Sequence, residues 1–158
     1  MTYSAEKTRQ AGIRKINLPV YVMLALTLVG ISDAMYVAYG SYSGTQLWCP
    51  ILDGCNTVVN SPYSRVLGMP MSYFGFIYYL FMFGLAARLA YEPASKSLRF
   101  RAVLYAALGA VSSAYFIYLQ LSLIQAICSY CIISAIVSFL LLLAALWHFQ
   151  VTRSKNFD

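Results

Sequence analysis

The sequence predicts an all-α membrane protein, folded as a bundle of four transmembrane helices. Of its 158 residues, 61% are hydrophobic and only 10% are charged, so the chain is far more apolar than a soluble globular domain. The apolar residues fall into four blocks, each of about 20 residues or more, which is long enough to cross a bilayer. Lys and Arg gather at one end of these blocks. Composition therefore indicates one compact domain whose main solvent is lipid.

The four predicted helices follow one another with short connections, except for one longer segment. The first block is too long for the apolar region of a signal peptide and no clear cleavage site follows it, so we expect it to be retained. The predicted spans are Leu18–Gly40, Met71–Tyr91, Ala102–Ile124 and Cys128–Phe149.

The positive charges predict how the helices are oriented. Ten of the eleven Lys and Arg residues lie before the first span, around the connection between the second and third, or after the fourth. Because positive residues near helix ends stay on the cytoplasmic side, we expect both termini there. Residues 1–17 then form a basic N-terminal segment, 18–149 the membrane domain and 150–158 a C-terminal tail. The extracytoplasmic loop, 41–70, contains only Arg65. The net charge of +6 is explained by topology and lipid contact, and nucleic acid is not an expected partner.

All four cysteines lie in or beside segments that the charges place on the extracytoplasmic side. They are Cys49, Cys55, Cys128 and Cys131. If they were only small core residues they would be scattered among the helices. An oxidising compartment instead favours disulfide chemistry at these positions.

The two cysteine pairs differ in their local sequence. Cys128 and Cys131 form a C-x-x-C at a predicted helix start, where backbone amides and the helix dipole stabilise a thiolate. Cys49 and Cys55 lie in a segment rich in Gly, Pro, Asp, Asn and Ser, which indicates a loop, with a short amphipathic helix near Thr57–Arg65. Passage of electrons from the loop pair to the helix pair requires a transient disulfide between the pairs.

Two other interpretations use the same cysteines. Four extracellular cysteines also suit two static disulfides in a four-span transport or assembly protein. A zinc site is disfavoured because the C-x5-C spacing of the loop pair is not typical of zinc ligands that complement a C-x-x-C. The one histidine, His148, is at the cytoplasmic end of the last span. No metal is therefore expected. A soluble thioredoxin-like fold is excluded because no strand pattern flanks the C-x-x-C.

At these residues the sequence resembles the vitamin K epoxide reductase family, in particular its bacterial members that reoxidise DsbA-like proteins. The resemblance covers nearly the whole apolar chain. It rests on the loop cysteines in Cys49-Pro50-x4-Cys55, on Ser61-x-Tyr63-Ser64-x2-Leu67-Gly68-x-Pro70 leading into Phe74-Gly75, and on the C-x-x-C that opens the last helix.

The resemblance implies a quinone-dependent, disulfide-forming enzyme of the bacterial inner membrane. Cys49 would meet a separate DsbA-like partner with a thioredoxin fold, Cys55 would exchange with Cys128, and Cys131 would face the quinone, which is ubiquinone or menaquinone. The matching quinone pocket would include Phe74, Gly75, Tyr78, Tyr115 and Phe116. A separate partner is expected because the chain ends ten residues after His148, without the fused thioredoxin-like domain of many relatives.

A few positions depart from the family pattern or stand outside it. Met71 and Ala135 occupy the places where animal members carry the Asn and Tyr that hydrogen-bond vitamin K, so epoxide reduction is not expected. Asp33 lies inside the first span, where an ionised carboxylate is costly and usually functional. It would either relay protons to the quinone or hydrogen-bond a Ser or Tyr of another helix. Arg65 would steady a thiolate or contact lipid headgroups.

Overall fold

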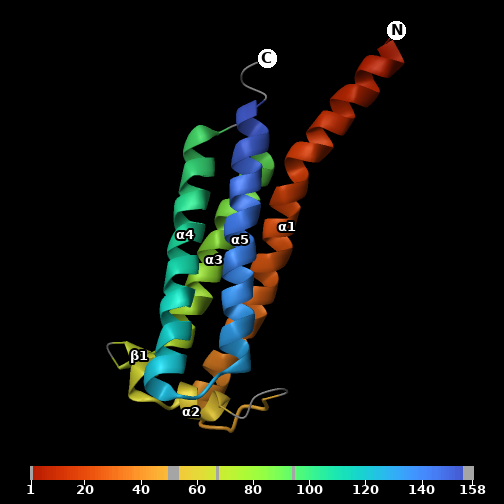
Figure 1. Cartoon of the computed structure of the whole chain (residues 1–158). Helices are drawn as coiled ribbons and strands as arrows, with labels where there is room; N and C mark the ends of the chain where they lie inside the picture. Colours follow the sequence, from red (N-terminus) through yellow and green to blue (C-terminus); the bar gives the residue numbers. More distant parts are fainter. Residues whose placement is uncertain (1, 50–53, 67, 94, 155–158) are drawn as a thin grey trace.

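The fold was determined as a computed structural model that describes residues 2–49, 54–66, 68–93 and 95–154, with side chains described from Leu18 to Arg153. Four long helices lie side by side, and both ends of the chain lie at the same end of the bundle (Figure 1). The long helices are α1 (Thr2–Ser43), α3 (Met71–Tyr91), α4 (Lys96–Leu119) and α5 (Ser129–Ser154). Each contains a stretch long and apolar enough to cross a membrane, which confirms the predicted four-helix fold.

Three of the helices extend beyond the apolar blocks that predicted them. The helix α1 continues through residues 2–17, which the sequence treats only as a basic segment, α4 begins at Lys96 before the predicted Ala102, and α5 continues past Phe149 to Ser154. Hydrophobicity marks the part of a helix that lies in lipid, whereas the backbone hydrogen bonds of a helix continue into water. The apolar pattern therefore predicts the spans better than it predicts the helix ends.

The core of the bundle combines alanines with larger aliphatic side chains, methionines and one tyrosine. The helix α1 packs against α3 and α5, and α4 packs mainly against α5. The ring of Tyr79 occupies the place where a Cβ on Gly30 would be, so α1 and α3 approach closely there. Many large apolar side chains, such as Leu28, Leu104 and Leu143, are exposed on the outer surface, as expected of helices that face lipid.

Short elements cap the end of the bundle opposite the termini (Figure 1). They are α2 (Cys55–Val59), the 3-10 helix η1 (Pro62–Ser64), and the antiparallel strands β1 (Arg65–Val66) and β2 (Met69–Pro70), with Arg65 opposite Pro70. The predicted helix at Thr57–Arg65 is thus corrected to two shorter pieces. Pro62 has no backbone N–H and cannot continue α2, but it fits the first turn of η1.

The connection from α4 to α5 places the C-x-x-C. After α4 the chain forms one turn of π-helix, η2 (Gln120–Ile124), and then ends it at Gln125, whose φ of 53° is left-handed. Cys128 directly precedes α5, and its carbonyl accepts the N–H of Ile132 at 3.1 Å. Cys128 is therefore the N-cap residue of α5.

Candidate redox site

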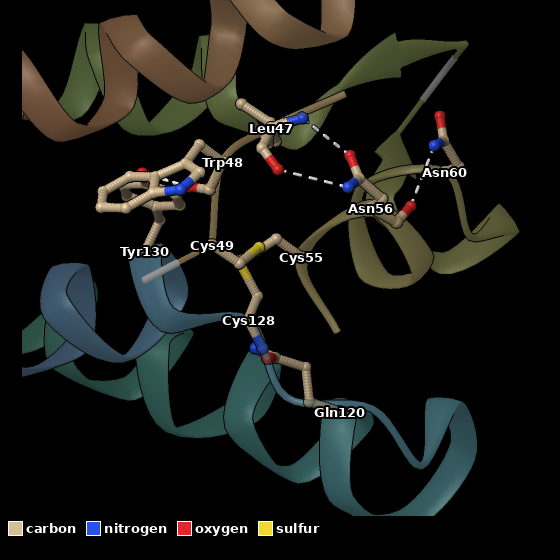
Figure 2. The surroundings of a disulfide bond; sticks show 9 residues. All are labelled: Leu47, Trp48, Cys49, Cys55, Asn56, Asn60, Gln120, Cys128 and Tyr130. Atoms are coloured by element: carbon tan, nitrogen blue, oxygen red, sulfur yellow. Dashed lines mark hydrogen bonds between the residues drawn. A yellow bond between two sulfur atoms is a disulfide. The ribbon is translucent and has the colours of Figure 1, made fainter. Parts of the chain in front are cut away.

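The structure brings all four cysteines together at the capped end of the bundle. Cys49 and Cys55 form a disulfide, with an S–S distance of 2.05 Å, and Cys128 and Cys131 are free thiols. Cys55 and Cys128 are buried in one apolar cluster, against which Cys49 and Cys131 pack. The Cys128 side chain points toward the disulfide (Figure 2). The two pairs expected from the sequence are therefore neighbours in space.

Polar contacts hold the loop beside the C-x-x-C. The Asn56 side chain accepts the N–H of Leu47 at 2.9 Å and donates to the Leu47 carbonyl at 3.3 Å (Figure 2). The hydroxyl of Tyr130, between the two helix cysteines, donates to the carbonyl of Trp48 at 2.7 Å. Because Asn56 follows Cys55 and Trp48 precedes Cys49, both ends of the disulfide are positioned.

A glycine allows the two backbones to meet. A Cβ added to Gly54 would lie 2.6 Å from the carbonyl oxygen of Ile127 and 2.7 Å from its nitrogen. Residues with a side chain cannot occupy this place without moving one of the two segments. The residue before Cys55 therefore lies directly on the residue before Cys128.

The surroundings of Cys128 favour its thiolate. A hydrogen bond from the Cys131 thiol is the main cause that lowers the pKa of Cys128, to about 7, with help from the backbone N–H groups of Cys131 and Tyr130 and against the effect of burial. The backbone N–H of Cys128 donates to Oε1 of Gln120 at 2.8 Å, which fixes the N-cap residue on the π-helix (Figure 2). Cys128 is thus suited to act as the nucleophile or as the leaving group in exchange with a neighbouring disulfide near neutral pH.

Cys131 faces a cavity inside the bundle. The cavity has a volume of about 350 Å³, which is within the range of small-molecule sites, and it is lined by residues of all four long helices. Cys131 lines it, and Cys128 does not. One cysteine of the C-x-x-C therefore faces the loop disulfide and the other faces the cavity. Of the residues expected in a quinone pocket, the lining includes Phe74, Gly75, Tyr78 and Phe116.

Tyr115 is the expected pocket residue that the structure does not bring to the cavity. Its side chain is 57% exposed on the outside of α4, where its ring meets that of Phe116 edge-on at 5.7 Å. The face of α4 that lines the cavity carries Ser112, Ser113 and Phe116, and Tyr115 lies outside it. The expectation for Tyr115 is therefore corrected.

Two hydroxyl groups in the cavity wall lack partners within the described part of the chain. They belong to Ser72 and Tyr78, and both are buried. The Tyr78 ring is fixed by stacking on Tyr105, with centroids 5.5 Å apart and an interplanar angle of 8°. Buried hydroxyl groups normally have a hydrogen-bond partner, so this wall suits a ligand that carries acceptor oxygens.

Several positioning residues were missed from the sequence. Gln120 had a detectable signal, because an amide within the predicted third span needs a reason to be there. Gly54 and Asn56 had no such signal in the sequence, since a loop rich in Gly and Asn indicates only a turn. Their roles depend on which distant segment the loop meets.

The chain was also compared with known proteins. The profile of the vitamin K epoxide reductase family matches residues 21–146, a range that includes the loop, the cavity helices and the C-x-x-C. The chain belongs to this family. It is also similar to the thiol-disulfide oxidoreductase LTO1 of Arabidopsis thaliana, with 35% identity over 118 residues. That match covers 68% of this chain and 30% of the length of LTO1.

Proposed function

We propose that the protein is a quinone-dependent thiol oxidoreductase that generates disulfides in a separate, DsbA-like protein with a thioredoxin fold. One observation carries the proposal: the Cys49–Cys55 disulfide packs on Cys128, while Cys131 lines the cavity. Such an arrangement suits electron flow from a water-soluble dithiol to a membrane-soluble acceptor. The name of LTO1 describes the same class of chemistry in that relative.

The partner reacts first at the loop. A thiolate of the reduced partner attacks the sulfur of Cys49, which is partly exposed, whereas Cys55 is fully buried. The Cys49–Cys55 bond breaks, a mixed disulfide with the partner forms, and Cys55 leaves as a thiolate. The second thiol of the partner then displaces Cys49. The partner departs oxidised, and the loop pair is left as two thiols.

Exchange between the pairs restores the loop disulfide. When Cys128 and Cys131 are joined, the Cys55 thiolate attacks Cys128 and Cys131 leaves, which forms a Cys55–Cys128 bond. Cys49 then attacks Cys55, and Cys128 leaves as a thiolate whose pKa of about 7 makes it a good leaving group. The loop pair is again oxidised and the C-x-x-C is reduced. The bonds in the structure correspond to this arrangement.

The cavity fits a quinone by its shape and its lining. Phe74 and Phe116 supply aromatic wall, and the hydroxyls of Ser72 and Tyr78 would donate to quinone oxygens. A bound quinone, ubiquinone or menaquinone, supplies the chemistry of a two-electron, two-proton acceptor. Cys131 lies in the same wall and re-forms its bond with Cys128 as it gives up electrons.

The orientation follows from charge and from the place of the termini. The start of α1 and the end of α5 lie at the opposite end of the bundle from α2, which begins at Cys55 (Figure 1). The basic residues of segment 1–17 and of the connection between α3 and α4 are at the termini end, which we assign to the cytoplasm. The membrane domain, residues 18–149, then presents its redox loop to the extracytoplasmic side of a bacterial plasma membrane, and 150–158 is a cytoplasmic tail.

Quinone reduction by the purified protein tests the proposal. Reduced DsbA-like protein is mixed with the enzyme in detergent and with a soluble ubiquinone or menaquinone analogue, and the quinone absorbance is followed. We expect catalytic loss of quinone, matched by one partner disulfide for each quinone reduced, and no activity in Cys131→Ser. If the four cysteines instead form two static structural disulfides, neither the unmodified protein nor Cys131→Ser will reduce quinone.

A further inference from the structure

Asp33 is a carboxyl group inside the cavity that the steps described so far do not use. It lies on α1 within the membrane span Leu18–Ser43, and it lines the cavity together with Cys131. Within the described part of the chain, no group hydrogen-bonds its carboxylate and no Lys or Arg pairs with it. A carboxyl group placed in a membrane without a partner is costly, which favours a function.

Within the described part of the chain, the other titratable groups that line the cavity with Asp33 are phenols and one thiol, and none of them is a cation. They are Tyr63, Tyr78, Tyr79, Tyr105, Tyr130 and Cys131. The structure therefore offers Asp33 a thiol and phenols rather than a salt bridge. The chemical role that suits the Asp33 carboxyl group in these surroundings is proton exchange with one of these groups.

The neighbouring hydroxyl groups are already engaged with one another. The Tyr79 hydroxyl hydrogen-bonds the carbonyl and the side chain of Ser134, each at 2.8 Å, and the Ser138 side chain at 3.1 Å. Ser134 and Ser138 lie below Cys131 on one face of α5 and also line the cavity. Asp33 is the one carboxyl group among the described lining residues.

We propose that Asp33 is the proton-transfer residue of the quinone-side step, which accepts the proton of the Cys131 thiol and donates it to an oxygen of the bound quinone. The inference rests on the proposed function, because it concerns the same cavity and the same acceptor.

The step balances as follows. Formation of the Cys128–Cys131 bond releases two electrons, which reduce the quinone to a quinol that also needs two protons. One proton passes from the Cys131 sulfur to the Asp33 carboxylate and on to the quinone oxygen. The quinol takes its second proton from water, which replaces the proton that Cys128 released to water when it ionised. Asp33 begins and ends the step ionised.

The test separates the two half-reactions. Enzyme reduced at the C-x-x-C is mixed with a soluble quinone in a stopped-flow instrument at a series of pH values. In Asp33→Asn we expect this step to slow by at least about tenfold at every pH, because the amide cannot carry the proton. Asp33→Glu should restore much of the rate. Exchange of the loop disulfide with reduced partner should be unchanged in both variants.

Glu92→Gln is the matched control. It makes the same carboxyl-to-amide change at an exposed residue at the other end of α3. We expect its quinone-side rate and pH profile to equal those of the unmodified protein.

A second readout does not require quinone. Infrared difference spectra between the disulfide and dithiol forms of the C-x-x-C should contain a carboxylate band, since Asp33 lines the same cavity as Cys131. The band should be absent in Asp33→Asn and present in Glu92→Gln. A band retained in Asp33→Asn would overturn the inference.

The possible failures are distinguishable. If the unmodified protein reduces no quinone, the proposed function fails. If it does so and Asp33→Asn keeps the same rate and pH profile, only the inference about Asp33 fails. Equal slowing of the loop and quinone half-reactions in Asp33→Asn would make Asp33 a structural residue, which also overturns the inference.

Discussion

At the scale of residues, the two cysteines of the C-x-x-C have opposite surroundings. Cys128 is fully buried against the loop disulfide, whereas Cys131 lines the cavity. This separation follows from local structure, because Cys128 caps α5 and Cys131 lies inside its first turn. One helix end thus presents one cysteine to the loop disulfide and the other to the cavity, as the proposed relay requires.

The thiol of Cys128 should ionise near neutral pH. Because its pKa is lowered to about 7, thiolate absorbance in the ultraviolet should increase as the pH rises through that value and should be nearly absent two pH units below it. In Cys131→Ala the hydrogen bond that mainly lowers the pKa is lost, so the midpoint should move up toward the ordinary cysteine value of about 8.5. An unchanged midpoint in Cys131→Ala would contradict the assigned cause.

At the scale of elements, the contact between loop and helix depends on Gly54. In Gly54→Ala the new methyl group would meet the Ile127 backbone, so Cys55 and Cys128 should separate. We expect exchange between the two pairs to slow by about tenfold or more, since small displacements of reacting atoms carry penalties of this size. Rapid-quench alkylation followed by mass spectrometry measures that exchange.

Gly84→Ala serves as the control for this substitution. A Cβ at Gly84 would meet no atom within 4 Å, and the residue lies on the outer surface of α3. Its exchange rate should equal that of the unmodified protein. Equal rates in Gly54→Ala as well would show that the close backbone contact is not needed.

Gly75 of α3 should set the room available in the cavity. A Cβ there would lie 3.9 Å from that of Ala34, an ordinary contact, so Gly75→Ala should fold normally while it narrows the cavity. We expect KM for the quinone to rise severalfold, because the added methyl group takes up space that the quinone ring would occupy. Exchange at the loop should be unchanged. Unaltered KM would indicate that the quinone does not lie against Gly75.

The elements also show what the sequence can and cannot predict. The spans and the positions of the cysteines were predictable, because apolar length and charge are local properties. The rotation of α4 was not, since the helix has no continuous polar stripe that would distinguish Tyr115 from Phe116. The π-helix at Gln120 was also hidden, because its register depends on a hydrogen bond to Cys128.

At the scale of the whole molecule, the bundle separates two environments. The cap of short elements lies at one end and the chain termini at the other (Figure 1). The cysteines lie where the cap meets the helices, between an aqueous face and a cavity enclosed by the bundle. The proposed path from a soluble protein to a quinone therefore needs no large movement of the helices, only exchange of bonds between neighbouring sulfurs.

The relay between the two cysteine pairs is tested most directly by mapping the disulfides of Cys49→Ser. This variant lacks the thiol that resolves the bond between loop and helix, so after oxidation by quinone the Cys55–Cys128 disulfide should accumulate. Acid quenching, alkylation and mass spectrometry identify the linked peptides, and Cys49→Ser combined with Cys128→Ser is the matched control that cannot form the bond. We expect Cys55–Cys128 as the main linkage in the single variant. Recovery of only the Cys128–Cys131 disulfide, with Cys55 always a free thiol, would contradict electron transfer between the pairs.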